Sequence, residues 1–464
     1  MKLNPLKINK LPSPPRSILQ LLGPSFVLIG LGLGTGELIL WPYLVSNFGL
    51  GIIWGAALGI TLQFFLNMEI ERYTLANGES VFVGFARLFK ALPIWFVLST
   101  VLAWSWPGFS ASAAAALKPF GAENTNLIAI GMLVLVGLIL TFGPVLYKTV
   151  ETFQKVLILV GIPVILIIVA IIVKSTDLLE LAKGLGGIGE GYLFVPKMLP
   201  LMSFLAAFAY SGAGGNLNLA QSFFIKEKKY GMGKYSGRIT SLITGKAEKI
   251  SLEGTTFKPD KEQIIIFKKW WKLVNIEHAM IFWFLGLLTI LLMAVLAYST
   301  VYGASGNLEG LNFLYNEAAT IGRQAGTIFE YLLLIIVCLM LFSTQLAVID
   351  GAGRIVSENI VLLFKDKLKG NPVPKIYYVT IWILLVFGIG VLLLGFGEPR
   401  FLIVLGAVLN AFCMFVFSGL LNKLNTKLLP KEIHPSLLRK LVIYATFAFF
   451  GIFSLLVLLD QIKI

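Results

Sequence analysis

The chain has 464 residues, of which 57% are hydrophobic and 13% are charged, and it carries a formal net charge of +14. Soluble domains average about 45–50% apolar and about 25% charged residues, so this composition excludes a soluble fold as well as the disordered and disulfide-rich classes. The two cysteines, Cys338 and Cys413, lie in apolar runs and provide neither a disulfide framework nor a zinc cluster. We therefore predict an all-α polytopic membrane protein.

Eleven segments of the sequence are long and apolar enough to cross a bilayer, which requires about 20 residues. When the N-terminus is placed on the inner side, all but seven of the 38 lysines and arginines fall on that side. This asymmetry follows the positive-inside rule and predicts an integral protein of the plasma membrane with a cytoplasmic N-terminus. The basic side is expected to meet anionic lipid headgroups, and no nucleic-acid partner is predicted. The predicted spans are 24–46, 50–68, 92–117, 126–146, 153–173, 197–224, 278–301, 328–358, 376–396, 400–421 and 440–460.

Two predicted spans, the first and the sixth, contain glycine clusters near their middles. The first cluster is Gly30–Glu37 and the second is Tyr210–Asn218. Each glycine costs a helix about 1 kcal/mol relative to alanine, so each cluster marks either a close helix–helix contact or a place where the helix unwinds. Corresponding positions of the two halves are five spans apart, and because this number is odd the two halves must be inverted in the membrane. Glycine-interrupted spans at matching places in two inverted halves indicate the central site of a secondary transporter.

This symmetry gives a predicted organisation with discontinuous helices 1 and 6 in a 5+5 inverted repeat. The linker before the seventh span is basic and ends in paired Trp270 and Trp271, which suit the headgroup interface. The sequence contains no G-x-x-x-x-G-K-[ST] motif, which excludes ATP-driven transport within this chain. The expected segments are a cytoplasmic tail (1–20), the first repeat (21–175), an outer loop with helix 6 (176–224), the cytoplasmic linker (225–275), helices 7–10 (276–425) and helix 11 with a short C-terminus (426–464).

Glu37 is the charged residue of the first cluster. A carboxylate at mid-membrane costs about 2.5–3.5 kcal/mol on insertion scales, so it indicates function unless it is protonated and hydrogen-bonded to a neighbouring helix. Carboxylate, amide and backbone oxygens are hard ligands that suit Mg²⁺, Ca²⁺, Mn²⁺ or an alkali cation. We predict a cation site with Glu37 and Asn216 as metal ligands, and the full predicted set is Gly34, Thr35, Glu37, Ala213, Asn216 and Asn218.

The eighth span carries a polar stripe of Asp350, Arg354 and Glu358. Residues spaced by four share one helix face, so pairing between them is geometrically natural. The stripe is compatible with structural ion pairs and with a proton or ion path, and the spacing does not separate these interpretations.

Five stretches of the chain resemble motifs of the Nramp metal-ion transporter family. Helix 1 has a family-like opening followed by a segment similar to DPGN, helix 5 has a Y-x-x-x-E pattern that ends in Glu151, helix 6 has an NL-type segment, and helix 8 has similar glycine and small-residue spacing. These stretches are Gly23–Phe26, Gly34–Glu37, Tyr147–Glu151, Asn216–Leu219 and Gly351–Val356.

The resemblance implies a LeuT-like fold and proton-linked uptake of divalent metal ions toward the cytoplasm, with Glu151 joining the polar stripe of helix 8 as an ion-pair or proton-path residue. The chain departs from the family at its metal ligands. The Asp of DPGN falls at Gly34 and its Asn at Glu37, while the Met, Pro and His of the helix 6 motif fall at Ala213, Gly214 and Gly215. Loss of the soft thioether argues against selectivity for transition metals over alkaline earths.

The sequence thus predicts a secondary transporter that moves a divalent cation by alternating access, with no cofactor and no identifiable protein partner. The alternative is a cation- or proton-coupled symporter of amino acids or another small organic solute, because helix N-termini at a Gly-Thr-Gly break also hold carboxylates. A membrane-embedded hydrolase is disfavoured, since Ser211 and Glu37 lack a histidine partner in the sequence pattern.

Overall fold

The computed structural model describes residues 3–15, 17, 21, 23–32, 34–142, 146–237, 252–368 and 372–462. Leu33 of the first glycine cluster, residues 238–251 of the predicted linker and residues 463–464 at the C-terminus lie outside this set. The first half of the chain forms α1 (Pro24–Gly32), η2 (Gly36–Leu40), α2 (Trp41–Phe48), η3 (Leu50–Ile52), α3 (Trp54–Asn77), α4 (Val81–Leu88), α5 (Leu92–Trp104), α6 (Gly108–Ala115), η4 (Lys118–Phe120), α7 (Thr125–Phe142), α8 (Leu146–Ile172) and α9 (Ser175–Leu185).

The second half follows with α10 (Leu201–Ala209), α11 (Leu217–Glu227), η5 (Gly231–Tyr235), α12 (Lys261–His278), η6 (Ala279–Leu285), α13 (Gly286–Val301), α14 (Asn312–Ala325), α15 (Thr327–Leu363), α16 (Val373–Leu393), α17 (Pro399–Leu428), η7 (Lys431–Ile433) and α18 (Leu437–Ile462). The strands are two-residue pairs: β1 (Lys7–Ile8) is parallel to β4 (Thr255–Thr256), and β2 (Ile188–Gly189) is antiparallel to β3 (Tyr192–Leu193).

The described residues contain ten helical stretches that are long and apolar enough to span a membrane. They correspond to ten of the eleven predicted spans, and the remaining one, 197–224, is the pair of short helices α10 and α11. The prediction of an all-α polytopic membrane protein with about eleven crossings is therefore confirmed.

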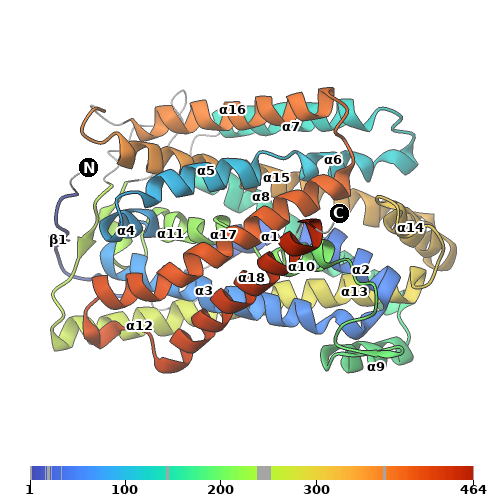
Figure 1. The fold of residues 1–464 in the computed structure, drawn as a ribbon, viewed down its shortest axis with the longest axis horizontal. Coiled ribbons are helices and arrows are strands. Elements are labelled where there is room, and N and C mark those ends of the chain that lie inside the picture. The colour runs from blue at the N-terminus through green and yellow to red at the C-terminus, as the bar shows by residue number, and fades with distance from the viewer. Residues whose placement is uncertain are drawn as a thin grey trace.

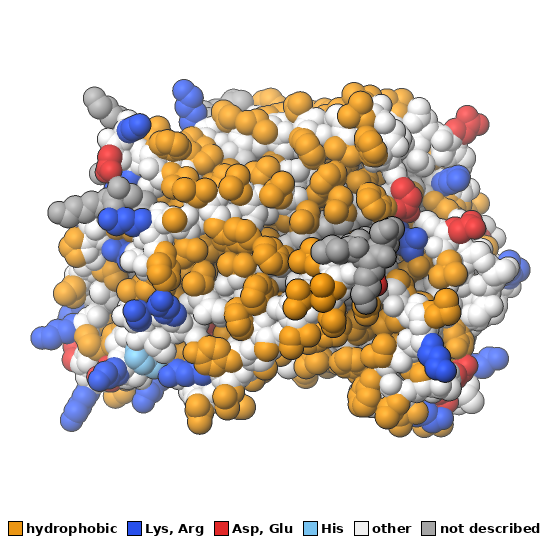
Figure 2. Space-filling view, viewed as in Figure 1, with side chains coloured by type: hydrophobic (Ala, Val, Ile, Leu, Met, Phe, Trp, Pro, Cys, Tyr) orange, Lys and Arg blue, Asp and Glu red, His pale blue; other side chains and the backbone are white. Residues whose placement is uncertain are grey.

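The interrupted helices lie in the middle of the bundle. The stretch Pro24–Phe48, which contains α1, η2 and α2, is buried throughout its apolar window, whereas only 28% of the corresponding window of α7 or of α18 is buried (Figure 1). Side chains of α7 and α18 contribute to a broad apolar band, with basic and acidic groups gathered toward the two ends (Figure 2). Helices exposed on the perimeter supply the surface that lipid solvates, and those at the centre are shielded from it.

The two ends of the bundle are built differently. One end, called the β1 end below, carries β1, α4 and α12, and the opposite end, called the α9 end, carries α9 and α14 (Figure 1). At the β1 end the N-terminal segment pairs with β4, and the Leu11 amide donates to Gln263 Oε1 at 2.5 Å. The segment predicted as a tail is thus attached to the linker through β1 and Leu11.

The paired tryptophans of the linker were expected at lipid headgroups, and this expectation is wrong for Trp270. Trp270 is buried, and its indole nitrogen donates to the Pro12 carbonyl at 2.7 Å. The Arg72 guanidinium carbon lies over the Trp271 ring, 3.8 Å from the ring centroid. A protein backbone and a protein cation replace the headgroup as partners of the two rings.

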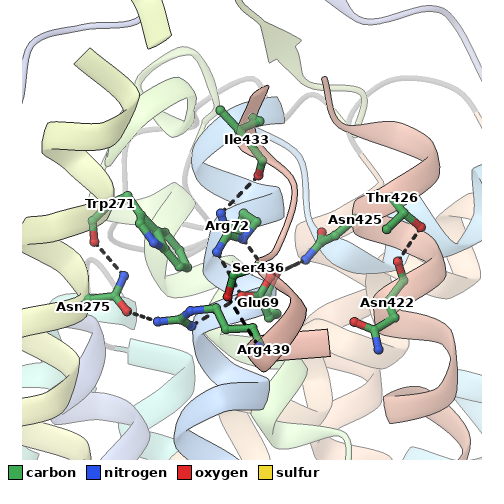
Figure 3. Close-up of polar contacts among 10 residues, drawn as sticks. All are labelled: Glu69, Arg72, Trp271, Asn275, Asn422, Asn425, Thr426, Ile433, Ser436 and Arg439. Carbon is green, nitrogen blue, oxygen red and sulfur yellow. Dashed lines mark hydrogen bonds and ion pairs between the residues drawn. The ribbon is translucent and has the colours of Figure 1, made fainter. Parts of the chain in front are cut away.

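The predicted second span, 50–68, ends too early because polar residues continue the helix inside the protein. Arg72 forms a two-point ion pair with Glu69, through Nε to Oε2 at 2.7 Å and Nη2 to Oε1 at 3.0 Å. Arg439 of α18 and Asn425 of α17 also contact the Glu69 carboxylate, at 3.4 and 3.0 Å (Figure 3). Hydropathy alone misses this extension, because the charges are compensated by side chains distant in sequence.

Substitution Glu69→Gln is expected to lower the free energy of unfolding by about 3–5 kcal/mol, because it leaves the buried Arg72 guanidinium and the partly buried Arg439 guanidinium without their carboxylate. The matched control is Glu180→Gln, whose pair with Lys183 is largely exposed and contributes no more than about 1 kcal/mol. Denaturant unfolding of both variants in detergent measures the difference, and equal losses of stability would contradict the structural role assigned to Glu69.

Candidate functional site

The first break lies between α1 and the π-helical turn η2, around Gly34 and Thr35. A Cβ atom on Gly34 would overlap Thr344 Oγ1 of α15, and one on Gly36 would overlap the Tyr210 carbonyl oxygen. At both positions the neighbouring atom lies too close for any side chain larger than hydrogen. The glycines therefore allow helix 1 to touch α15 and the second break directly, and π-helical turns of this kind recur at functional sites.

The second break joins α10 to α11 through Gly214 and Gly215, whose φ angles are +73° and +51°. Gln63 of α3 satisfies the opened backbone: its Nε2 donates to the Ala209 carbonyl at 3.0 Å, and its Oε1 accepts from the Gly214 amide at 3.1 Å. Backbone groups freed inside a membrane require such protein partners. The two glycine clusters are thus interruptions of the helices, and they meet at the contact between Gly36 and Tyr210.

Glu37 lies in η2, directly beside this contact, and its side chain is 0% exposed. Neither carboxylate oxygen has a hydrogen-bond partner among the described residues. A buried carboxylate without a partner is strongly unfavourable as a free anion, so it must hold a proton or a cation. No residue of a neighbouring helix forms a hydrogen bond with the Glu37 carboxyl group in the described part of the chain, as the protonated alternative would require.

The other predicted ligands are distributed around the second break. Ala213 and Thr35 are buried, and the Gly34 carbonyl accepts from the Leu38 amide at 3.1 Å, which leaves one of its two lone pairs. Asn216 donates to Ser99 Oγ and Thr100 Oγ1 of α5 at 2.8 and 2.9 Å.

Asn218 faces a different helix, where its amide donates to Gln63 Oε1 at 3.2 Å. The amide oxygens of both asparagines are buried and have no hydrogen-bond partner among the described residues. The segment η2, which carries Glu37, packs against α10 and α13, whereas Asn216 and Asn218 are directed by their hydrogen bonds toward α5 and α3. The structure therefore brings the two breaks together, but among the described residues it joins Glu37 to neither asparagine by a hydrogen bond.

Aromatic rings cover the helix 6 break. Trp104 at the end of α5 stacks on Tyr210 with a centroid separation of 5.6 Å and an interplanar angle of 19°. Asn410 of α17 donates to the Tyr210 hydroxyl at 3.1 Å, and its side chain occupies the space that a Cβ of Gly215 would need. The indole nitrogen of Trp104 and the amide oxygen of Asn410 are buried and unpartnered among the described residues.

The polar stripe of α15 forms ion pairs at the β1 end. Arg354 Nε lies 2.9 Å from both oxygens of Asp350, as the four-residue spacing predicts, and Tyr377 of α16 donates to Asp350 at 2.7 Å. Arg354 also pairs with Glu227 of α11. This network links three helices.

Glu358 and Glu151 have lysine partners instead. Glu358 lies 3.6 Å from Lys226 of α11 and accepts from Ser80, so it does not extend the Asp350–Arg354 pair. Glu151 of α8 pairs with Lys155 at 2.5 Å and with Lys228 at 2.8 Å. Nothing is described of the Tyr147 side chain. Each of these acids is thus held in an ion pair. A role as structural ion pairs and a role in a proton path both stay predictions for them.

Sequence analysis missed Gln63, Thr344 and Asn410, which support the breaks from α3, α15 and α17. Gln63 has a detectable signal, since Gln63, Asn67 and Glu71 recur every four residues along a span that is otherwise apolar. Thr344 stands between Ser343 and Gln345, and Asn410 is a single polar residue in an apolar helix; only the contacts at Gly34 and Gly215 reveal their positions.

Among the residues that the structure describes, no group of three or more histidine, cysteine, aspartate or glutamate side chains is placed to hold a metal ion. A cation at the breaks therefore has to be bound by one carboxylate together with amide and backbone oxygens. That donor set is hard, which favours cations such as Mg²⁺, Ca²⁺ or Mn²⁺.

No protein-family model and no curated protein sequence matches the chain. Its fold nevertheless matches solved structures of the Eremococcus coleocola manganese transporter. One mutant of that transporter aligns with a TM-score of 0.70 and 13% identity over 98% of this chain and 90% of that one. Its complex with an aromatic bis-isothiourea substituted compound aligns with 0.67 and 14% over 99% and 92%. Mhp1, a nucleobase-cation-symport-1 family transporter solved with bromovinylhydantoin bound, aligns with a TM-score of 0.54 and 14% identity over 99% and 95%.

These similarities show the fold: a LeuT-like arrangement, as predicted, in an integral membrane protein whose structural neighbours are transporters.

Substitution Gly36→Ala is expected to destabilise the protein by about 1–3 kcal/mol, because the new methyl group overlaps the Tyr210 carbonyl and one of the two helices must shift. The matched control is Gly131→Ala in α7, where a Cβ meets nothing within 4 Å and the alanine favours the helix. Thermal unfolding in detergent compares the two. A Gly36 variant as stable as the Gly131 variant would mean that the breaks do not touch.

Proposed function

We propose that this protein is a secondary transporter that moves a divalent metal cation by alternating access, with the cation bound between the two helix breaks. The observation that carries the proposal is the Glu37 carboxylate, which is fully buried at the contact between the breaks and has no partner among the described residues. Intramembrane carboxylates without structural partners characterise ion pathways. A bound cation would compensate this charge.

The ligands proposed beside Glu37 are oxygens. Asn216 and Asn218 use their amide nitrogens in hydrogen bonds and keep their amide oxygens unpartnered among the described residues. Backbone carbonyls at Gly34, Thr35 and Ala213 complete the proposed set. Because Asn216 and Asn218 now face α5 and α3, binding requires side-chain rearrangement or bridging waters, and divalent ions such as Mg²⁺ retain waters in many protein sites.

Alternating access is proposed to involve the ion pairs at the β1 end. Arg354 joins α15 to α11, and the Lys226–Glu358 pair joins the same two helices. α11 begins at the helix 6 break, so its movement would open the site toward the β1 end only after these pairs separate. We assign Asp350, Arg354, Glu358 and Glu151 to holding this end closed.

The family and the orientation belong to the same proposal. The motif resemblance and the fold of the manganese transporter structures support placing the chain as a divergent member of the Nramp family. The excess of lysine and arginine on the β1 side supports a cytoplasmic β1 end, and a plasma-membrane location follows from that orientation.

A second candidate is a symporter of a small organic solute. Trp104 and Tyr210 stack at the helix 6 break, and a buried donor on Trp104 and a buried acceptor on Asn410 are unpartnered among the described residues. Flat aromatic faces with a few polar groups are typical of organic-ligand sites. Mhp1, whose structure contains a bound hydantoin, has a similar fold.

Uptake into proteoliposomes distinguishes the candidates. The wild type is expected to accumulate Mn²⁺ or another hard divalent cation, and Glu37→Gln is expected to reduce this uptake by about 10–100-fold, since a charged ligand contributes about 1.5–3 kcal/mol. Amino acids and nucleobases are tested in parallel. Undiminished cation uptake by Glu37→Gln would contradict the assignment of Glu37, and solute uptake without cation uptake would favour the second candidate.

A further inference from the structure

A second buried polar cluster, separate from the helix breaks, lies toward the β1 end, where α1, α3, α11 and α12 meet. Its members are Ser25 near the start of α1, Glu71 of α3, Gln221 of α11, and Glu277 and His278 at the end of α12. All five side chains are buried.

Hydrogen bonds and one longer polar contact connect the five residues into a chain. Ser25 Oγ lies 2.5 Å from Glu277 Oε2 and 2.7 Å from His278 Nδ1. The same His278 nitrogen lies 3.6 Å from Glu71 Oε1, which accepts from the Gln221 amide at 2.5 Å. The imidazole is held in place by stacking on Phe282, with ring centroids 4.7 Å apart.

The two carboxylates of the cluster have no salt-bridge partner of permanent charge in the described part of the chain. Glu71 and Glu277 are only 1% and 2% exposed, and neither forms an ion pair with a lysine or arginine among the described residues. Lys155 of α8 is close enough for its charge to act on Glu277, but its ion pair in this structure is with Glu151. The Tyr230 hydroxyl donates to the Leu21 carbonyl.

Glu69 provides a contrast two residues from Glu71 on the same helix. Its carboxylate is compensated by Arg72, Arg439 and Asn425 (Figure 3). Burial near the β1 end therefore does not by itself leave an acid uncompensated. Two uncompensated buried carboxylates are stable only when protons neutralise them, and neighbouring carboxylates commonly share a proton.

Several atoms of the cluster have binding capacity that the described residues do not use. Glu71 Oε2, Glu277 Oε1, Gln221 Oε1 and His278 Nε2 are buried and have no hydrogen-bond partner there. Buried polar atoms in native structures are nearly always paired, so this concentration of open positions indicates bound protons or water.

A line of polar side chains leads from the cluster to the helix 6 break. On α3, Gln63, Asn67 and Glu71 are spaced by four residues and therefore share a face. Gln63 binds the Gly214 amide at the break, and Glu71 belongs to the cluster. Asn67 lies between them, buried, with both amide atoms unpartnered among the described residues.

The cluster also touches parts of the chain that are suited to movement. Ser25 is the second residue of α1, the half of helix 1 that precedes the break. His278 is followed at once by η6, a seven-residue π-helical segment that packs on α1 and α3. A change of protonation at the cluster would act on both interrupted elements.

We propose that Glu71, Glu277 and His278 form a second ion site that takes up a proton during transport, connected to the cation site by the line of Gln63 and Asn67. Proton uptake converts a carboxylate or imidazole of the cluster to its protonated form, and release on the other side of the cycle restores it. This inference rests on the proposed transport function and adds the site at which a proton couples to it.

The first test measures cation accumulation and internal acidification in proteoliposomes with and without an inward proton gradient. Glu71→Gln and Glu277→Gln are expected to lose the gradient-dependent accumulation, while cation exchange without a gradient stays within about twofold of wild type. Glu317→Gln is the matched control, because Glu317 of α14 is equally buried and unpartnered among the described residues but lies at the α9 end. It should retain gradient-driven accumulation.

Retention of gradient-driven accumulation and acidification by both cluster variants would overturn the inference and leave the proposed function standing. A wild type that exchanges no cation would instead contradict the proposed function.

Proton binding is measurable independently of transport. Infrared difference spectra of the purified protein between about pH 5 and pH 8 should contain a carboxylic-acid band that Glu71→Gln or Glu277→Gln removes and Glu317→Gln leaves unchanged. Absence of any band sensitive to the cluster variants would overturn the inference even if the variants proved too unstable for reconstitution.

Discussion

The fold depends on one constraint: two helices are interrupted inside a membrane-spanning bundle, and their freed backbone groups must be satisfied by protein. Gly36 touches the Tyr210 carbonyl, and Gln63 binds both sides of the helix 6 break through the Ala209 carbonyl and the Gly214 amide. These contacts require the interrupted helices to lie at the centre, shielded by the perimeter helices from lipid.

The same constraint explains why chemistry is concentrated in the middle of an apolar protein. An unwound segment exposes carbonyls and amides that continuous helices use internally, and it gives a carboxylate such as Glu37 a polar setting. Elsewhere along α3, α11 and α15, charge is tolerated in compensated networks such as Glu69 with Arg72 and Arg439. Glu317 of α14 is also buried and unpartnered among the described residues, so missing compensation alone does not assign a site. We propose ion sites at Glu37 and at Glu71 with Glu277 because these acids adjoin the interrupted helices.

The sequence was sufficient to predict most of the fold, because membrane spans are set by length and apolarity. The sixth span was predicted as one segment with a glycine break, and its two halves appear as α10 and α11. The second span was cut short at residue 68, because the compensation of Glu69 comes from α17 and α18, more than 350 residues away. Local hydropathy does not contain such long-range pairing.

The candidate site was predictable only in part. Glycines and a lone carboxylate identify the breaks, but not which residues hold them, and Gln63 and Asn410 became evident from their contacts. Likewise, spacing on α15 predicts the Asp350–Arg354 pair but not the lysine from α11 that pairs with Glu358. Side-chain direction and partner choice depend on tertiary packing, which no single-helix pattern encodes.

The central claim, that the helix breaks bind a cation through Glu37, is tested most directly by locating the ion. Crystals of the protein soaked with Mn²⁺ would be measured at a wavelength where manganese scatters anomalously. The account predicts an anomalous peak within coordination distance of the Glu37 carboxylate, between the two breaks. A well-occupied peak elsewhere in the bundle, or a hydrogen-bonded Glu37 with no peak beside it at saturating Mn²⁺, would contradict it.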